Sequence, residues 1–273
     1  MRRFLGIAVG LLVQVLFVVA SYYNYDFLCG SAPRSTPANL GWDAVLALQF
    51  CIVHSVLLLP ATRKKIQRFI SPAFYGLFFC TAACTTLLIT MTFWQVGDWA
   101  IWQLSGWPRL VVQTLYLGCW GTLFYSLCCS GFGYHTGWLP WWYWVRRQAI
   151  PRRPFNPHGA FALMRHPGYL SFLGLIWFTP DMTVDRALLT GLWSVYIFGG
   201  SCLKDMRLTH YMGDTYRAYQ ARVPGYPGMF FGPLARRRLP AASSGTQLAL
   251  ASSVAGRDSM ASVGEILPGS RAA

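Results

Sequence analysis

The sequence is poor in charged residues, above all in acidic ones. Only 12% of its 273 residues are charged, whereas a typical soluble domain has about 25%. Aspartate and glutamate together number 9, and the single glutamate is Glu265, against 23 lysines and arginines. Hydrophobic residues make up 54% of the chain. This composition argues against a soluble domain and indicates a membrane protein.

The eight cysteines do not form the pattern of a disulfide framework or of a zinc site. A structural zinc site needs two closely spaced pairs of ligands, and no two such pairs occur here. Most of the cysteines lie within apolar runs, where a free thiol behaves as a small hydrophobic group. Cys80 and Cys84 are one helical turn apart, which favours packing over metal chemistry.

Long apolar runs dominate the first half of the chain. A membrane-spanning helix needs about 20 mostly apolar residues. Four runs meet this requirement: Phe4–Tyr23, Trp42–Pro60, Ala73–Trp94 and Leu110–Cys129. The first run also resembles a secretory signal peptide, but no small-residue cleavage site follows it, and the other spans favour a retained helix.

A fifth apolar region, Tyr169–Cys202, is interrupted at Thr179-Pro180-Asp181-Met182-Thr183. Each half is short for a complete span, so we expect a helical hairpin with its turn near Pro180. The predicted fold is therefore all-α: a multi-pass membrane helical bundle with four spans plus a C-terminal helical hairpin.

The basic residues are distributed unequally between the two sides of this predicted bundle. With the N-terminus inside, only Arg34, Arg109 and Arg186 fall on the outer side. The positive-inside rule then predicts that both termini are cytoplasmic. The net charge of +14 serves orientation and contact with the anionic headgroups of the lipid bilayer, and we expect no nucleic-acid partner.

Three regions follow from this organisation. Residues 1–130 form a four-span membrane region. Residues 131–238 form a cytoplasm-facing segment, the hairpin and the candidate catalytic region. Residues 239–273 are rich in serine, alanine and glycine, lack the apolar mass to fold alone, and are predicted to be a disordered tail.

Two polar clusters flank the hairpin. Arg165-His166-Pro167-Gly168-Tyr169 precedes it, and Lys204-Asp205-Met206-Arg207 follows it. A carboxylate at the end of an apolar helix is costly without a partner. If the hairpin returns to the cytoplasmic side, Asp205 comes back near Arg165 and His166. The clusters would then form either a functional site or a structural ion pair with interface anchors.

These clusters carry a resemblance to a known family. R-H-P-x-Y-L, a hairpin, a polar pair and then G-x-x-Y-x-x-Y-x-x-R-V-P resembles the isoprenylcysteine carboxyl methyltransferase superfamily. The chain is most similar to its nurim branch, which includes bacterial methanethiol S-methyltransferases and NnrU-like proteins. The resemblance extends over roughly residues 4–227. The matching stretches are Gln49–Ser55, Ser71–Tyr75, Phe93–Gln95, Arg165–Thr183 and Gly213–Pro227.

The resemblance implies methyl transfer from S-adenosyl-L-methionine to a small thiol, most simply methanethiol, which would yield dimethyl sulfide. It places His166, Pro167, Tyr169, Asp205, Tyr216 and Tyr219 at the cofactor. Arg165 or Arg207 could act in catalysis, because a nearby cation favours the nucleophilic thiolate. The chain departs from the family at three places. Lys204-Asp205 replaces a Glu-Glu pair, Ser171 replaces a glycine, and Leu127–Ser130 stands where the methanethiol enzymes have polar residues.

Three alternatives stay open at this stage. The methyl acceptor could be a prenylcysteine or a lipid. The chain could be a non-enzymatic envelope membrane protein like nurim, a reading that the charge reversal at Lys204 favours. A transporter is disfavoured because no internal repeat is visible and the mid-span polar residues are few, namely Gln14, Gln49, His54 and Gln113.

Overall fold

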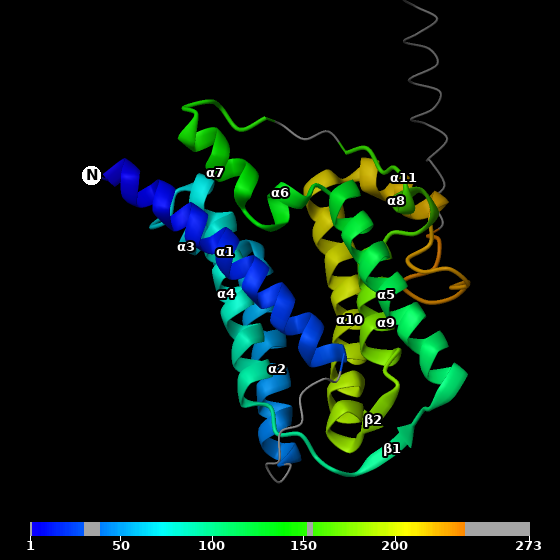
Figure 1. Cartoon of the computed structure of the whole chain (residues 1–273). Helices are drawn as coiled ribbons and strands as arrows, with labels where there is room; N and C mark the ends of the chain where they lie inside the picture. The colour runs from blue at the N-terminus through cyan, green and yellow to red at the C-terminus, as the bar shows by residue number, and fades with distance from the viewer. Residues whose placement is uncertain (1, 30–38, 152–154, 238–273) are drawn as a thin grey trace, which may run out of the picture.

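The computed structural model describes residues 2–29, 39–151 and 155–237, and the predicted tail at 239–273 lies outside this range. The described chain is mainly helical, and its long helices run between two ends of a bundle (Figure 1). Among the described residues, four helices are long and apolar enough to cross a membrane, and the protein is an integral membrane protein. The predicted fold class is confirmed.

The four predicted spans correspond to α1 (Arg2–Cys29), α2 (Leu40–Leu58), α4 (Pro72–Phe93) and α5 (Gly106–Cys129). The predicted hairpin consists of α9 (Pro167–Trp177) and α10 (Val184–Met212). The remaining elements are short: α3 (Pro60–Ile66), β1 (Ala100–Gln103), α6 (Phe132–His135), α7 (Trp138–Val145), α8 (Ala160–Leu163), β2 (Asp181–Thr183) and α11 (Asp214–Arg222).

Local sequence explains where several of these helices begin. Asn39 caps α2, because its side-chain oxygen accepts a hydrogen bond from the Trp42 backbone N–H at 3.1 Å. Prolines occupy the first turn of α3, α4 and α9, where the missing N–H would have had no partner within the helix.

One part of the bundle consists of α1, α2, α4 and α7. Helix α1 packs across α4, and the indole N–H of Trp141 in α7 donates to the carbonyl of Gly6 in α1 at 2.9 Å. Gly76 of α4 lies against Gly137 at the start of α7, where an added Cβ would meet the Gly137 Cα at 2.7 Å. Glycine is required at this contact because the two backbones touch.

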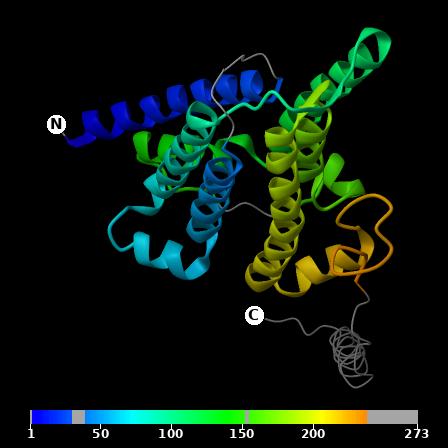
Figure 2. The same ribbon diagram turned by 90° about the horizontal axis from the view of Figure 1, so that it is seen from below.

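The other part consists of α5 and the hairpin (Figure 2). Helix α9 packs on α5, where the hydroxyls of Thr122 and Ser171 share a hydrogen bond of 2.9 Å. Helix α10 packs on α9 and α2, and so joins the two parts. The 11 residues of α9 reach only about 16 Å, so the extended segment after Trp177 completes the crossing of the bundle.

A small sheet closes one end of the bundle, which we call the sheet end. Strand β1 pairs with β2 in antiparallel fashion, with Ala100 opposite Thr183 and Trp102 opposite Met182. The hairpin prediction placed a turn near Pro180 but no strands there. Strands this short carry too little alternation of apolar and polar residues to be recognised from sequence.

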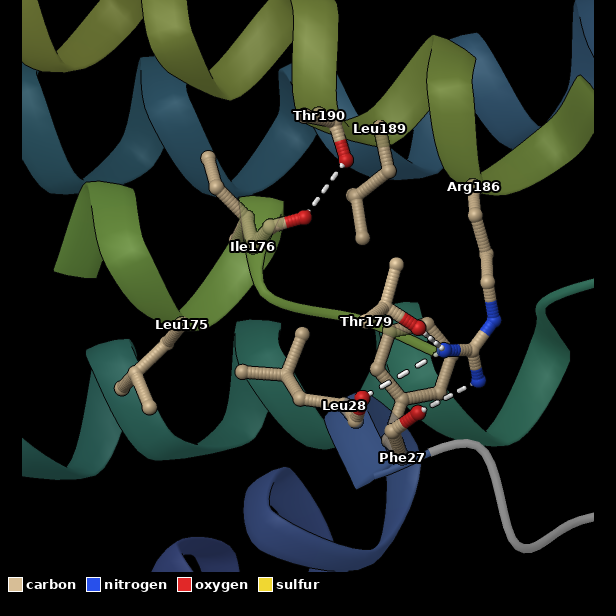
Figure 3. A pocket seen from close by; sticks show the side chains of 8 residues that line it. All are labelled: Phe27, Leu28, Leu175, Ile176, Thr179, Arg186, Leu189 and Thr190. Atoms are coloured by element: carbon tan, nitrogen blue, oxygen red, sulfur yellow. Dashed lines mark hydrogen bonds between the residues drawn. The ribbon is translucent and has the colours of Figure 1, made fainter. Parts of the chain in front are cut away.

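Two basic residues of the predicted outer side lie at the sheet end. Arg109 forms a 3.0 Å ion pair with Asp181. Arg186 donates to the carbonyls of Phe27 and Leu28 at the end of α1, and to the Thr179 hydroxyl (Figure 3). The small cavity beside these groups holds about 10 Å³. Arg186 therefore fixes the last turn of α1 to the hairpin.

A buried carboxylate completes the sheet end. Asp185 is 1% exposed and accepts hydrogen bonds from the Trp94 indole at 3.0 Å and from the Gly97 backbone at 3.1 Å. Asp43 likewise accepts from the backbone of Gln95 at 2.9 Å. The loop after α4 is thereby tied to both α2 and α10.

Candidate functional site

The two predicted polar clusters meet at the opposite end of the bundle, where α8 and α11 lie (Figure 1). The residues before α9 supply Arg165 and His166, the last part of α10 supplies Asp205, and α11 supplies Tyr216. Backbone hydrogen bonds from Arg165 to Pro224 and from His166 to Gly225 fix the first cluster against the segment that follows α11. The convergence expected from the hairpin is therefore present.

A buried ion pair forms the centre of the site. The Nη2 and Nε atoms of Arg165 lie 2.8 and 3.0 Å from Oδ2 of Asp205. Both residues are 1% exposed. In such surroundings a lone charge is strongly destabilising, so each partner is required by the other.

The remaining N–H groups of Arg165 bind the backbone of the C-terminal segment. Nη1 donates to the carbonyl of Val223 at 2.6 Å and to those of Gln220 and Ala235 at 3.4 and 3.3 Å, while Nη2 reaches Leu234 at 3.3 Å. The guanidinium thus binds carbonyl groups that have no hydrogen-bond partner within a helix, and it fixes this segment over the end of α10.

The second oxygen of Asp205 is also occupied. The Tyr216 hydroxyl donates to Oδ1 at 2.6 Å, and Nε2 of His166 lies 3.1 Å from the same atom. Burial and the nearby Asp205 carboxylate raise the pKa of Tyr216 well above its usual range, so the phenol keeps its proton. Asp205 is thus in contact with Arg165, His166 and Tyr216 at once.

His166 is fully buried beside Tyr169, and the two rings stack with centroids 5.6 Å apart and an angle of 12° between planes. Nε2 lies 3.1 Å from Oδ1 of Asp205 but lacks the alignment of a hydrogen bond. Nδ1 has no hydrogen-bond partner within the described ranges. Burial lowers the pKa of His166 more than Asp205 raises it, so the imidazole is neutral near pH 7.

Tyr219 and Pro167 lie at the edges of this cluster. The Tyr219 hydroxyl donates to the carbonyl of Phe161 at 2.6 Å, and burial raises its pKa to about 12. The Phe155 ring packs edge-on against both Tyr219 and Tyr216. Pro167 occupies the first turn of α9 and is buried. These contacts hold α8 and α11 together over the site.

Arg207 differs from Arg165 in its surroundings. It is half-buried on α10 and makes no hydrogen bond or ion pair with any residue that the structure describes. Lys204, one turn earlier, places its Nζ 4.9 Å from the ring centroid of Tyr169 and 6.0 Å from that of Phe161. The catalytic roles predicted for Arg165 and Arg207 stay predictions.

The sequence did not single out several residues that build this site. Ser201 and Tyr226 share a hydrogen bond of 2.5 Å beneath His166, and the Tyr226 ring lies 5.7 Å from the imidazole. Tyr226 falls within the R-V-P-G-Y-P stretch, which was the one available signal. The carbonyls that bind Arg165 could not be identified, because every residue has a carbonyl.

An apolar groove of about 690 Å³ lies beside the site, between α5, α8 and α9. Pro167, Leu170 and Gly174 line it on α9, and Cys119 and Tyr125 line it on α5. The groove therefore lies on the face of α9 that packs towards α5.

Comparisons with known proteins find relatives that are named either methanethiol S-methyltransferase or nurim. A methanethiol S-methyltransferase from Pseudomonas sp. (strain GM41) is 27% identical over 234 residues, which cover 80% of this chain and 88% of that protein. One from Mycobacterium tuberculosis is 26% identical over 82% of this chain and 96% of its own length. Nurim from Rattus norvegicus is 25% identical over 64% of this chain and 70% of its own length.

No family model and no solved structure gives a significant match. The aligned parts of the two methanethiol S-methyltransferases extend over most of both sequences, and a match of this extent at a quarter identity indicates common descent across the bundle. The chain is thus a relative of the methanethiol S-methyltransferases and of nurim, and the resemblance to the nurim-like branch predicted from its sequence is confirmed.

Proposed function

We propose that the chain is an S-adenosyl-L-methionine-dependent membrane methyltransferase that acts on a small thiol, with methanethiol as the simplest acceptor. One observation supports this most strongly: a buried polar cluster of Arg165, His166, Asp205 and Tyr216 at one end of the helical bundle, in a chain related to enzymes of that name. The roles of individual residues in catalysis and in cofactor binding belong to this proposal.

The residues present fit a methyl donor of this kind. His166 has one buried ring nitrogen, Nδ1, without a hydrogen-bond partner among the described residues, and this atom can bind a polar group of the donor, while Nε2 lies against Asp205. Tyr169 beside it offers an aromatic ring, to which a sulfonium cation is attracted. Tyr216, Tyr219 and Pro167 support this pocket from α11 and from the first turn of α9.

Within this proposal, Arg165 and Asp205 hold the pocket together. All three nitrogens of the Arg165 guanidinium are already engaged, and both Asp205 oxygens have partners. Neither group is therefore free to bind a reactant without breaking this arrangement. Their role is to position His166 and the segment after α11.

Arg207 is the residue we assign to the thiol. Its N–H groups are not engaged by described residues, and a guanidinium near a thiol stabilises the thiolate, which is the nucleophilic form. When bound, S-adenosyl-L-methionine supplies a sulfonium-activated methyl group, so transfer to methanethiolate gives dimethyl sulfide and S-adenosylhomocysteine. The thiol has given up its proton to solvent beforehand.

The proposal is tested with purified protein reconstituted in liposomes. Labelled S-adenosyl-L-methionine and methanethiol are supplied, and dimethyl sulfide is measured in the headspace together with donor binding. We expect product from the wild type and a loss of about 100-fold in His166→Ala, because misplacement of a bound reactant costs on this order. Lys64→Gln, an exposed lysine on α3, is the matched control and should retain full activity.

The non-enzymatic alternative has one observation in its favour. A fixed cation, Lys204, lies over the ring of Tyr169, where a cationic donor is expected to bind. A folded wild-type protein that neither binds S-adenosyl-L-methionine nor releases dimethyl sulfide would contradict the enzymatic proposal. Such a result would favour a nurim-like membrane protein with an inactive pocket.

A further inference from the structure

Two cations near the end of α10 have no carboxylate partner in the part of the chain that the structure describes. Lys204 and Arg207 are three residues apart, which places them on the same face of the helix, and both are half-buried. Neither forms an ion pair with a carboxylate in residues 2–29, 39–151 or 155–237. They are therefore two neighbouring positive charges that no carboxylate of the described residues neutralises.

The nearby carboxylates are already used. Asp205 lies between the two cations in sequence, but Arg165 binds one of its oxygens and Tyr216 binds the other. Asp214, at the start of α11, is exposed and pairs with Arg217 at 2.7 Å. Neither acid can neutralise Lys204 or Arg207 without releasing its present partner.

The position of Lys204 connects this pair to the candidate site. Its Nζ lies 4.9 Å from the centroid of Tyr169, and that ring stacks on His166. Arg207 is near enough to Tyr169 and Lys204 to interact with both electrostatically, and it repels the Lys204 ammonium. The two cations thus lie beside Tyr169 and His166, where the proposed function places the methyl donor.

Partly buried cations without a counter-charge are unfavourable, and an anionic ligand removes that cost. An ammonium and a guanidinium side by side suit a carboxylate, which the guanidinium can bind with two parallel hydrogen bonds. The aromatic rings of Tyr169 and Phe161 beside Lys204 would hold an apolar part of the same ligand.

We propose that Lys204 and Arg207 together bind a carboxylate of one of the two reactants. This inference rests on the proposed function and deepens it, because the guanidinium of Arg207 has five N–H donors and can bind the carboxylate with two of them while another faces the thiolate. The carboxylate has two possible sources: the methionine part of S-adenosyl-L-methionine, or an acceptor that is a mercapto acid rather than uncharged methanethiol. The chemistry of recognition is the same for both.

The test uses the full-length protein in nanodiscs and the variants Lys204→Gln, Arg207→Gln and the double substitution. Binding of S-adenosyl-L-methionine, of its decarboxylated analogue and of 3-mercaptopropionate is measured by calorimetry. Methyl transfer to 3-mercaptopropionate and to methanethiol is measured in parallel. Arg217→Gln is the matched control, since it removes an exposed cation at the same end of the bundle.

Each source of the carboxylate gives its own result. If the donor supplies it, the variants weaken S-adenosyl-L-methionine binding by about 10-fold or more, and binding of the decarboxylated analogue does not change. If the acceptor supplies it, donor binding is unchanged, while the variants weaken 3-mercaptopropionate binding and lower its kcat/KM relative to that of methanethiol by a similar factor.

Two results overturn the inference. In the first, the variants, folded as judged by thermal unfolding, bind all three ligands as the wild type does and keep its acceptor preference. In the second, the wild type binds neither carboxylate ligand. Failure of the proposed function is distinguishable, because a wild type that transfers no methyl group can still be tested for charge-dependent binding of 3-mercaptopropionate.

Discussion

At the scale of single residues, Asp205 decides how the site is built. One carboxylate receives the guanidinium of Arg165, the hydroxyl of Tyr216 and the close approach of His166. Together with Asp205 itself, these groups come from three separate parts of the chain, and all are nearly inaccessible to solvent. Because both of its oxygens are occupied, Asp205 holds these side chains together and is not free to bind a reactant.

The first prediction concerns the stability of this cluster. Asp205→Asn should lower the free energy of unfolding by about 3–5 kcal/mol, since it leaves the Arg165 charge buried and unpaired. Tyr216→Phe should cost less, about 1.5–3 kcal/mol, because it removes one hydrogen bond to a charged group and leaves the ion pair intact. Denaturant-induced unfolding in detergent micelles measures both.

Asp214→Asn serves as the control for that comparison, since Asp214 is exposed and its pair with Arg217 contributes little. Its unfolding midpoint should match that of the wild type. Equal losses of stability in Asp205→Asn and Asp214→Asn would contradict the central role assigned to the buried carboxylate.

At the scale of elements, hydropathy predicted the four spans to within a few residues, except that α1 continues six residues beyond Tyr23. In the hairpin, α10 continues ten residues beyond the predicted end at Cys202. The broken run at Pro180 predicted the hairpin, and the hairpin explains why Arg165 and Asp205 meet. The short strands could not be predicted, since three or four residues show no clear period. The carbonyl partners of Arg165 depend on the path of the chain after α11, which no side-chain pattern encodes.

Packing between elements is tested at the contact of α4 with α7. Gly76→Ala places a methyl group 2.7 Å from the Cα of Gly137, where backbone rather than a flexible side chain must move. We expect a loss of about 1–3 kcal/mol from this overpacking. Thermal unfolding in detergent gives the comparison with wild type.

Gly191→Ala is the matched substitution in α10, where an added Cβ meets nothing within 4 Å. It should leave stability unchanged or raise it by about 0.4–1 kcal/mol, because alanine restricts the unfolded chain. If both variants behave alike, helix propensity rather than the close approach of α4 and α7 governs the effect.

At the scale of the whole molecule, the two ends of the bundle carry different chemistry. The sheet end contains Arg109 and Arg186, and both are engaged with partners there. The other end contains the basic residues of α3 and α11 and the candidate site. The unequal distribution of charge seen in the sequence is thus a property of the folded bundle.

The last prediction is the orientation of this bundle in the membrane. Four spans and a hairpin that leaves and returns to one end bring the residues after α10 back to the side on which α1 begins. The positive-inside rule assigns that side to the cytoplasm, because short loops rich in lysine and arginine are retained there.

Reporter fusions after Arg237 and within the loop between β1 and α5 measure this orientation. We expect a cytoplasmic reporter, such as a fluorescent protein, to be active only in the first fusion, and alkaline phosphatase only in the second. Replacing Arg63, Lys64 and Lys65 with glutamine should raise the fraction of inverted molecules, since it removes basic residues from the loop that follows α2. Active phosphatase after Arg237 in the unaltered protein would place the candidate site on the outer side, where it could not draw on cytoplasmic S-adenosyl-L-methionine.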